Sequence, residues 1–112
     1  MSYGPDEFQR DLGSDVSRET IARLEIHHRL LGEWSERMNL VGPKELELFW
    51  SRHALDSAQL IKFASQAKRW VDLGSGAGFP ALVVAAFLAD QPDTSVHLVE
   101  STGKKAAFLR AV

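Results

Sequence analysis

The spacing of apolar residues predicts a helical first half of the chain. From Ser17 onward, apolar side chains recur at close to helical intervals, with charged residues between them that can face water. Ser17 itself is a suitable N-terminal cap. A break at residues 39–43 ends this helix, and Pro43 can begin the next one, because a proline at the first helical position loses no hydrogen bond. With a polar turn or kink near residues 53–57, we expect helices over residues 17–64.

Residues 69–112 have the pattern of a strand, a glycine-rich turn, a helix, a second strand and a final helix. A short buried strand is expected at residues 70–73, and the uniformly apolar run 81–89 predicts a buried helix. Residues 95–100 follow a polar turn and form the second strand, which ends on Glu100. Such a strand–helix–strand connection is right-handed and implies a parallel sheet. The sequence therefore predicts an α/β fold in which N-terminal helices precede one βαβ unit.

The turn after the first strand is the main candidate for a binding site. Gly74, Gly76 and Gly78 allow backbone conformations that other residues avoid and leave room for a ligand. In parallel sheets, ligands bind beyond the carboxyl ends of the strands, where both this turn and Glu100 are expected. Glu100 can accept hydrogen bonds from ribose hydroxyls. These features indicate a nucleotide-like ligand.

Two cofactors compete for this turn. Residues 76–81 match the dinucleotide fingerprint G-x-G-x-x-A, and Glu100 lies near the expected separation of about 20 residues. In the other frame, Asp72 stands two residues before Gly74. An acid there suits a ligand with a cationic amine, such as S-adenosylmethionine, but lies unfavourably close to the pyrophosphate of NAD. The sequence favours S-adenosylmethionine. A glycine turn that binds no ligand is less expected, because three glycines and two suitably placed acids rarely occur together.

Composition limits the remaining possibilities. The 112 residues, 45% of them apolar, suit one small domain, with residues 1–16 as a mobile tail and residues 17–112 as the folded part. There is no apolar run of about 18 residues and no signal-peptide pattern, so no membrane span is expected. The lack of cysteine excludes disulfides and fits a cytoplasmic protein. The net charge of −2 gives no indication of nucleic-acid binding, and His27 and His28 lack the carboxylates of a metal site.

Two further groups of polar residues are candidates for a site. His53 and Asp56 lie one helical turn apart beside Arg52 and could form a polar patch over the glycine turn, although helix capping is the simpler interpretation of their spacing. Lys104 and Lys105 begin the last helix and could contact phosphates, although such lysines more often form a solvated face.

Several segments resemble the bacterial small-subunit ribosomal RNA guanine-N7 methyltransferases, the glucose-inhibited division protein B family. The segments are Met38-Asn39-Leu40-Val41, Arg52-His53-Ala54-Leu55-Asp56-Ser57, the glycine stretch through Phe79-Pro80, and Leu98-Val99-Glu100-Ser101-Thr102-Gly103-Lys104-Lys105 with Phe108-Leu109. The resemblance covers about residues 20–112. It implies a class I (Rossmann-like) methyltransferase fold, S-adenosylmethionine as cofactor and small-subunit ribosomal RNA as substrate.

The resemblance also implies roles for individual residues. The cofactor would be bound by Asp72, Gly74, Ser75, Gly76, Ala77, Gly78, Phe79, Glu100 and Ser101, and the mouth of the active site would be formed by Asn39, Arg52, His53 and Asp56. The reaction is methyl transfer to guanine N7, which carries a lone pair and no proton. No general base is needed, so catalysis is by orientation and no catalytic residue is assigned.

Members of this family are about twice as long as the chain, and their sheet has more strands than the two that are clear here. We therefore expect the N-terminal part of a methyltransferase, inactive alone and able to self-associate through exposed sheet edges. A fragment of an NAD-binding oxidoreductase and a non-catalytic interaction module remain as alternatives.

Overall fold

The computed structural model describes residues 3–13 and 16–112. Its elements are α1 (Pro5–Leu12), α2 (Arg18–Met38), α3 (Pro43–Glu47), the π-helical segment η1 (Phe49–Ala54), α4 (Leu55–Phe63), β1 (Arg69–Leu73), α5 (Ala81–Leu88), β2 (Ser95–Val99) and α6 (Gly103–Ala111). The two strands pair in parallel, with Arg69 opposite Ser95 and Leu73 opposite Val99. The predicted α/β organisation, with helices before one βαβ unit, is confirmed.

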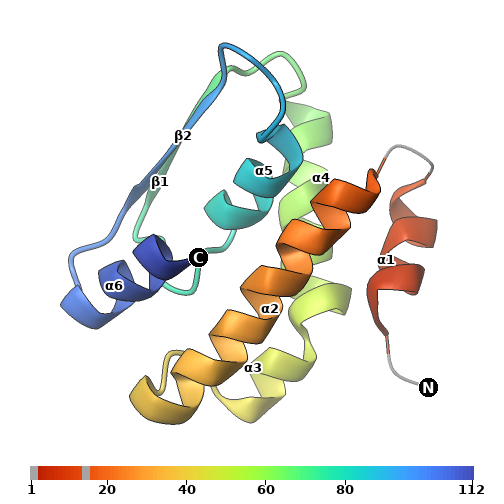
Figure 1. The fold of residues 1–112 in the computed structure, drawn as a ribbon. Helices are drawn as coiled ribbons and strands as arrows, with labels where there is room; N and C mark the ends of the chain where they lie inside the picture. Colours follow the sequence, from red (N-terminus) through yellow and green to blue (C-terminus); the bar gives the residue numbers. More distant parts are fainter. Residues whose placement is uncertain (1–2, 14–15) are drawn as a thin grey trace.

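The helices lie on one side of the sheet in successive layers (Figure 1). α5 packs against the sheet, α2 and α4 pack against α5, and α1 lies farthest from the strands. The core between the layers is largely aromatic and aliphatic, and its most deeply buried side chains include Phe8, Leu24, Leu31, Phe49, Val83 and Phe108. None of the helices in the described ranges combines the length and apolar character that crossing a bilayer requires.

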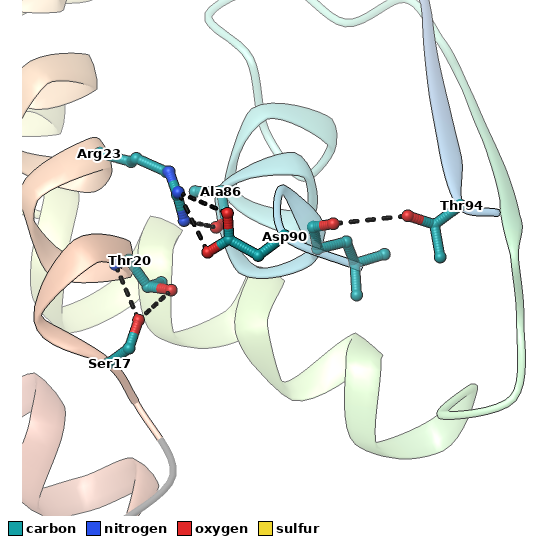
Figure 2. Close-up of polar contacts among 7 residues, drawn as sticks. Ser17, Thr20, Arg23, Ala86, Asp90 and Thr94 are labelled. Carbon is teal, nitrogen blue, oxygen red and sulfur yellow. Dashed lines mark hydrogen bonds and ion pairs between the residues drawn. The ribbon is translucent and has the colours of Figure 1, made fainter. Parts of the chain in front are cut away.

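α2 begins as its sequence predicts and is tied to α5 by a polar contact (Figure 2). The Oγ of Ser17 accepts a hydrogen bond from the Thr20 backbone N–H at 3.1 Å, which caps the helix. Farther along α2, the Arg23 guanidinium donates to both carboxylate oxygens of Asp90, at 3.1 and 3.2 Å. The same guanidinium donates to the Ala86 carbonyl at 3.3 Å. α2 is therefore attached to the C-terminal end of α5.

The expectation of a mobile tail over residues 1–16 is wrong for Pro5–Leu12, which form α1. Glu7 Oε1 accepts a hydrogen bond from the Gly4 backbone N–H at 2.7 Å, and this contact closes the first turn. Phe8 is fully buried and packs edge-on against Trp50, with ring centroids 5.3 Å apart. Burying a side chain of this size contributes about 3 kcal/mol. Together with the partly buried Leu12, Phe8 docks this mostly polar helix. Residues 1–2 and 14–15 lie outside the described residues.

The irregularity expected near residues 53–57 starts earlier and is not a turn. η1 continues directly into α4, and its wider winding lets the His53 backbone N–H donate to the Leu48 carbonyl, five residues back, at 3.1 Å. Phe49 and Trp50 are both buried in this segment. The chain therefore changes helical geometry here without leaving the helix.

The first strand, expected to be buried, is buried on one face only. Trp70 and Asp72 are partly buried, whereas Val71 and Leu73 are 64% and 78% exposed and Val99 on β2 is 49% exposed. Side chains alternate between the two faces of a strand, and the helices cover only one face of this sheet. Val71, Leu73 and Val99 form what we call the bare sheet face.

Candidate functional site

The glycine turn joins β1 to α5 at the carboxyl end of β1, where the sequence predicted it. Gly74, Gly76 and Gly78 have φ angles of +78°, +53° and +98°, values that residues with a side chain rarely adopt. Gly78 is constrained a second time by space. A Cβ atom there would lie 2.5 Å from Leu82 Cδ1 and 3.0 Å from His27 Nε2. The turn therefore requires glycine at position 78 on two independent grounds.

Backbone hydrogen bonds hold the turn against the end of β2. The N–H groups of Gly74 and Ser75 both donate to the Val99 carbonyl, at 2.8 and 3.1 Å. The buried Ser75 hydroxyl donates to the Asp72 carbonyl at 3.1 Å, and the Gly78 N–H donates to the Ser75 carbonyl at 2.8 Å. The shape of the turn is thus defined by its own backbone.

Glu100 lies beside the turn, as predicted, and binds the backbone on two sides. Its Oε2 accepts from the Thr102 N–H at 3.0 Å, and its Oε1 accepts from the Gly76 N–H at 2.7 Å. These two donors hold the pKa of Glu100 below its usual value. A carboxylate can accept about four hydrogen bonds, so two acceptor positions remain on this partly buried side chain. Ser101, the next residue, is exposed.

Asp72 has an unsatisfied oxygen. Its Oδ2 is buried, and no residue in the described part of the chain donates a hydrogen bond to it. Buried polar atoms in native proteins are nearly always paired, because an unpaired one costs about 1–3 kcal/mol. Asp72 Oδ2 can therefore accept a hydrogen bond from a donor group of a ligand beside the glycine turn.

A buried histidine on α2 contacts the turn from the helical side. His27 Nε2 lies 2.8 Å from the Ala77 carbonyl oxygen, and since a carbonyl only accepts, Nε2 carries the hydrogen. The ring is 1% exposed and lies 5.1 Å from the Phe79 ring and 5.2 Å from the Phe49 ring. Burial lowers the pKa of His27 from 6.5 to about 4, against the opposing effect of the Ala77 hydrogen bond. The ring is therefore neutral at pH 7.

Sequence reasoning assigned His27 no part in a site. The hydrogen bond joins His27 to Ala77, which are 50 positions apart, and the spacing of residues within α2 does not predict it. The one available signal was that His27, a polar residue, lies on the buried face of α2.

The structure brings the predicted polar cluster to the far end of the turn. Arg52, His53, Asp56 and Phe79 line a cavity of about 340 Å³, together with Ser57, Leu60 and Pro80. The His53 ring stacks on Phe79, with centroids 4.8 Å apart and planes 20° apart. His53 Nε2 lies 2.6 Å from Glu45 Oε2, a contact that the sequence did not predict. Arg52, His53 and Asp56 therefore line one cavity with Phe79, but the charged partner of His53 is Glu45, whereas the sequence suggested Asp56.

Asn39 and Lys104 lie at the C-terminal end of α2. Asn39 ends the helix in the left-handed conformation, with φ 53° and ψ 47°. Lys104 Nζ donates to the Met38 carbonyl at 3.0 Å, which places a cation at the negative end of the helix dipole. Lys105 lies near enough to Glu100 to help lower its pKa. Phosphate contact by either lysine stays a prediction, and no cluster of metal-ligating side chains occurs within residues 3–13 and 16–112.

Comparison with known proteins agrees with the resemblance in the sequence. The family model described as GidB, rRNA small subunit methyltransferase G, matches residues 20–112. The protein named ribosomal RNA small subunit methyltransferase G of Brucella anthropi is 56% identical over 95 residues, which are 85% of this chain and 45% of that protein. Its namesake in Bradyrhizobium diazoefficiens is also 56% identical over 95 residues, 85% of this chain and 36% of that protein. The match thus spans less than half the length of these relatives. On this evidence the chain belongs to the GidB family, the small-subunit ribosomal RNA methyltransferases G.

Proposed function

We propose that this chain forms the cofactor-binding part of a class I methyltransferase that uses S-adenosylmethionine to methylate guanine N7 in small-subunit ribosomal RNA. The observation that carries the proposal is the unpaired, buried Asp72 Oδ2 beside a three-glycine turn, in a chain 56% identical to proteins named ribosomal RNA small subunit methyltransferase G. A ribosomal RNA substrate would place the activity in the cytoplasm.

The residues of the turn fit S-adenosylmethionine better than a dinucleotide. Asp72 Oδ2 offers an acceptor to the cationic amine, and Glu100 keeps acceptor positions for ribose hydroxyls. A pyrophosphate needs free backbone N–H groups. Four N–H groups of this turn already donate within the protein, those of Gly74, Ser75, Gly76 and Gly78. The same two carboxylates would repel a pyrophosphate, so the NAD alternative is disfavoured.

Methylation of N7 requires this chain to hold its ligands in place. Bound S-adenosylmethionine supplies an electrophilic methyl group, and guanine N7 attacks with a lone pair that no base has to release. The residues therefore contribute orientation. We propose that an unstacked guanine lies against the cavity lined by Arg52, Asp56 and the stacked pair of His53 and Phe79. His53 is held in that position by Glu45.

Turnover and RNA binding are proposed to need the additional length that the relatives possess. In this chain the bare sheet face exposes Val71, Leu73 and Val99, and we propose that it allows the isolated chain to self-associate. Sedimentation should show association that Leu73→Lys weakens. Phe63→Lys, which changes an exposed residue outside that face, should leave it unchanged.

The test of the proposed function is calorimetric titration of S-adenosylmethionine and, separately, of NAD. The titrations would use the 112-residue chain and a chimera. In the chimera, the C-terminal portion of the Brucella anthropi relative follows Val112. We expect the chimera to bind S-adenosylmethionine and to methylate small-subunit ribosomal RNA, and the chain alone to show no turnover. Asp72→Asn should weaken binding at least tenfold, since a hydrogen bond to a charged group contributes about 1.5–3 kcal/mol. Asp93→Asn, an exposed position outside the turn, is the matched control.

Other results would contradict the proposal. Binding of NAD in place of S-adenosylmethionine would establish the dinucleotide alternative. Binding of neither ligand by a folded chimera would favour the non-catalytic interaction module.

A further inference from the structure

One face of α2 contacts both ends of the segment formed by the glycine turn and α5. Arg23 bonds to Ala86 and Asp90 at the C-terminal end of α5 (Figure 2). His27, one helical turn farther along α2, bonds to Ala77 just before α5 begins. Residues four positions apart lie on the same face of a helix, so these two side chains act together. They set the position of α2 along α5 and, with it, the position of the His27 ring against the turn.

We propose that His27 is a positioning residue for the glycine turn: its Nε2–H bond and its ring fix the peptide after Ala77 in the orientation that the cofactor requires. This inference rests on the proposed function, because it assigns to the N-terminal helices a part in binding S-adenosylmethionine. His27 touches neither the reacting atoms nor, by this reasoning, the cofactor itself.

Three consecutive residues of the turn meet the His27 ring. Ala77 accepts its hydrogen bond, Gly78 would bring a Cβ to within 3.0 Å of Nε2, and Phe79 packs its ring 5.1 Å away. A rotation of any of these three peptides would break a contact or create a clash. The turn is thus defined from the helical side as well as by its own backbone.

Aromatic packing restricts the His27 ring in turn. Phe49 packs edge-on to it at 5.2 Å, and Phe108 from α6 lies 6.1 Å away. Arg23 is the charged group on the same face of α2, and it is occupied by Asp90. A side chain packed in this way holds one rotamer, which is what a positioning residue needs. Phe79 extends the effect to the proposed active-site mouth, because its ring also stacks on His53.

The test compares hydrogen exchange of turn amides with that of a reference amide in the 112-residue chain. The turn amides are those of Gly76 and Gly78, and the reference is the Val84 N–H, which bonds to Pro80 within α5. The ratio of their rates separates local opening of the turn from a general loss of stability. His27→Phe keeps a ring and removes the donor, whereas His27→Gln keeps an N–H donor.

We expect His27→Phe to speed exchange of the turn amides at least tenfold relative to Val84, and His27→Gln to restore the ratio to within about threefold. His28→Phe is the matched control, because His28 stacks on Phe49 and has no hydrogen bond to the turn among those identified in the described chain. An unchanged ratio in His27→Phe would overturn the inference. If His27→Phe does not fold, ring nitrogen NMR of the unmodified chain decides: a proton on Nδ1 in place of Nε2 at pH 7 would overturn it as well.

The second measurement is the affinity of the chimera for S-adenosylmethionine. His27→Phe should raise Kd about tenfold and lower the rate at saturating cofactor by less than that. If the unmodified chimera binds no S-adenosylmethionine, the proposed function fails and the exchange ratio still decides whether His27 positions the turn. If it binds and His27→Phe binds equally well, the proposed function stands and the role of His27 is refuted.

Discussion

Gly78→Ala is the substitution for which the structure predicts the largest local effect in the turn. An alanine would have to adopt φ +98° and would place its methyl group 2.5 Å from Leu82 Cδ1 and 3.0 Å from His27 Nε2. Leu82 can move aside, since its side chain is only partly buried. The His27 ring moves less readily, because it is hydrogen-bonded to Ala77 and packs against the Phe49 and Phe79 rings. Relieving the close contact with His27 would therefore strain its hydrogen bond to Ala77.

The free energy of unfolding should fall for two reasons. A positive φ at a residue with a side chain costs about 1–3 kcal/mol, and a methyl group forced into a packed site costs about 1–3 kcal/mol more. Because Leu82 relaxes, we expect a total of about 3 kcal/mol. In a domain of this size, that loss lowers Tm by about 12–24 °C.

Two other glycines separate the two contributions. Gly74 has φ +78° and open space around its missing Cβ, so Gly74→Ala measures backbone strain alone and should cost about 1–2 kcal/mol. Gly103, in the first turn of α6, has neither constraint, and Gly103→Ala should be neutral or stabilise the chain by up to about 1 kcal/mol. The three variants would be compared by urea denaturation under identical conditions.

The order of the three variants decides the outcome. If Gly78→Ala is no more destabilising than Gly74→Ala, the steric argument from His27 is wrong. If both behave like Gly103→Ala, the backbone conformation described for the turn is wrong.

Two further predictions concern the helical layers. Phe8→Ala should lower the free energy of unfolding by about 3–4 kcal/mol in urea denaturation and release α1, because it empties the one deeply buried position of that helix. Arg10→Ala, at an exposed position of the same helix, should change stability by less than about 0.5 kcal/mol. Equal effects of the two substitutions would show that α1 is not docked. Burial in the folded state lowers the pKa of His27 from 6.5 to about 4, so the unfolded chain takes up the proton first as pH falls. The free energy of unfolding should therefore decline between about pH 6.5 and pH 4, by about 3 kcal/mol in total. Urea midpoints over that range should fall less steeply in His27→Phe, and identical slopes would refute the assignment.

Local features of the fold could be predicted from the sequence. The cap at Ser17, the start of a helix at Pro43, both strands and the glycine turn all depend on residues a few positions apart. Parallel pairing followed as well, because a strand–helix–strand unit has one favoured handedness. The candidate residues Asp72 and Glu100 came from the same reasoning, since both sit at strand ends.

Other features depended on contacts between distant parts of the chain. α1 has one deeply buried residue, Phe8, and the partly buried Leu12 packs against the same core, but a short and mostly polar segment has the pattern of a loop. The bare sheet face could not be predicted from the strand sequence, because Val71 and Leu73 are as apolar as core residues and only the arrangement of the layers leaves them exposed.

The sequence by itself therefore determined the local backbone and the chemical types gathered at the edge of the sheet. Only the tertiary structure decided their partners: Glu100 binds the Gly76 N–H, His53 pairs with Glu45, and His27 reaches Ala77 across 50 positions. The physical reason is that backbone conformation follows from neighbours within one turn of chain, whereas a side-chain hydrogen bond follows from which layers pack together.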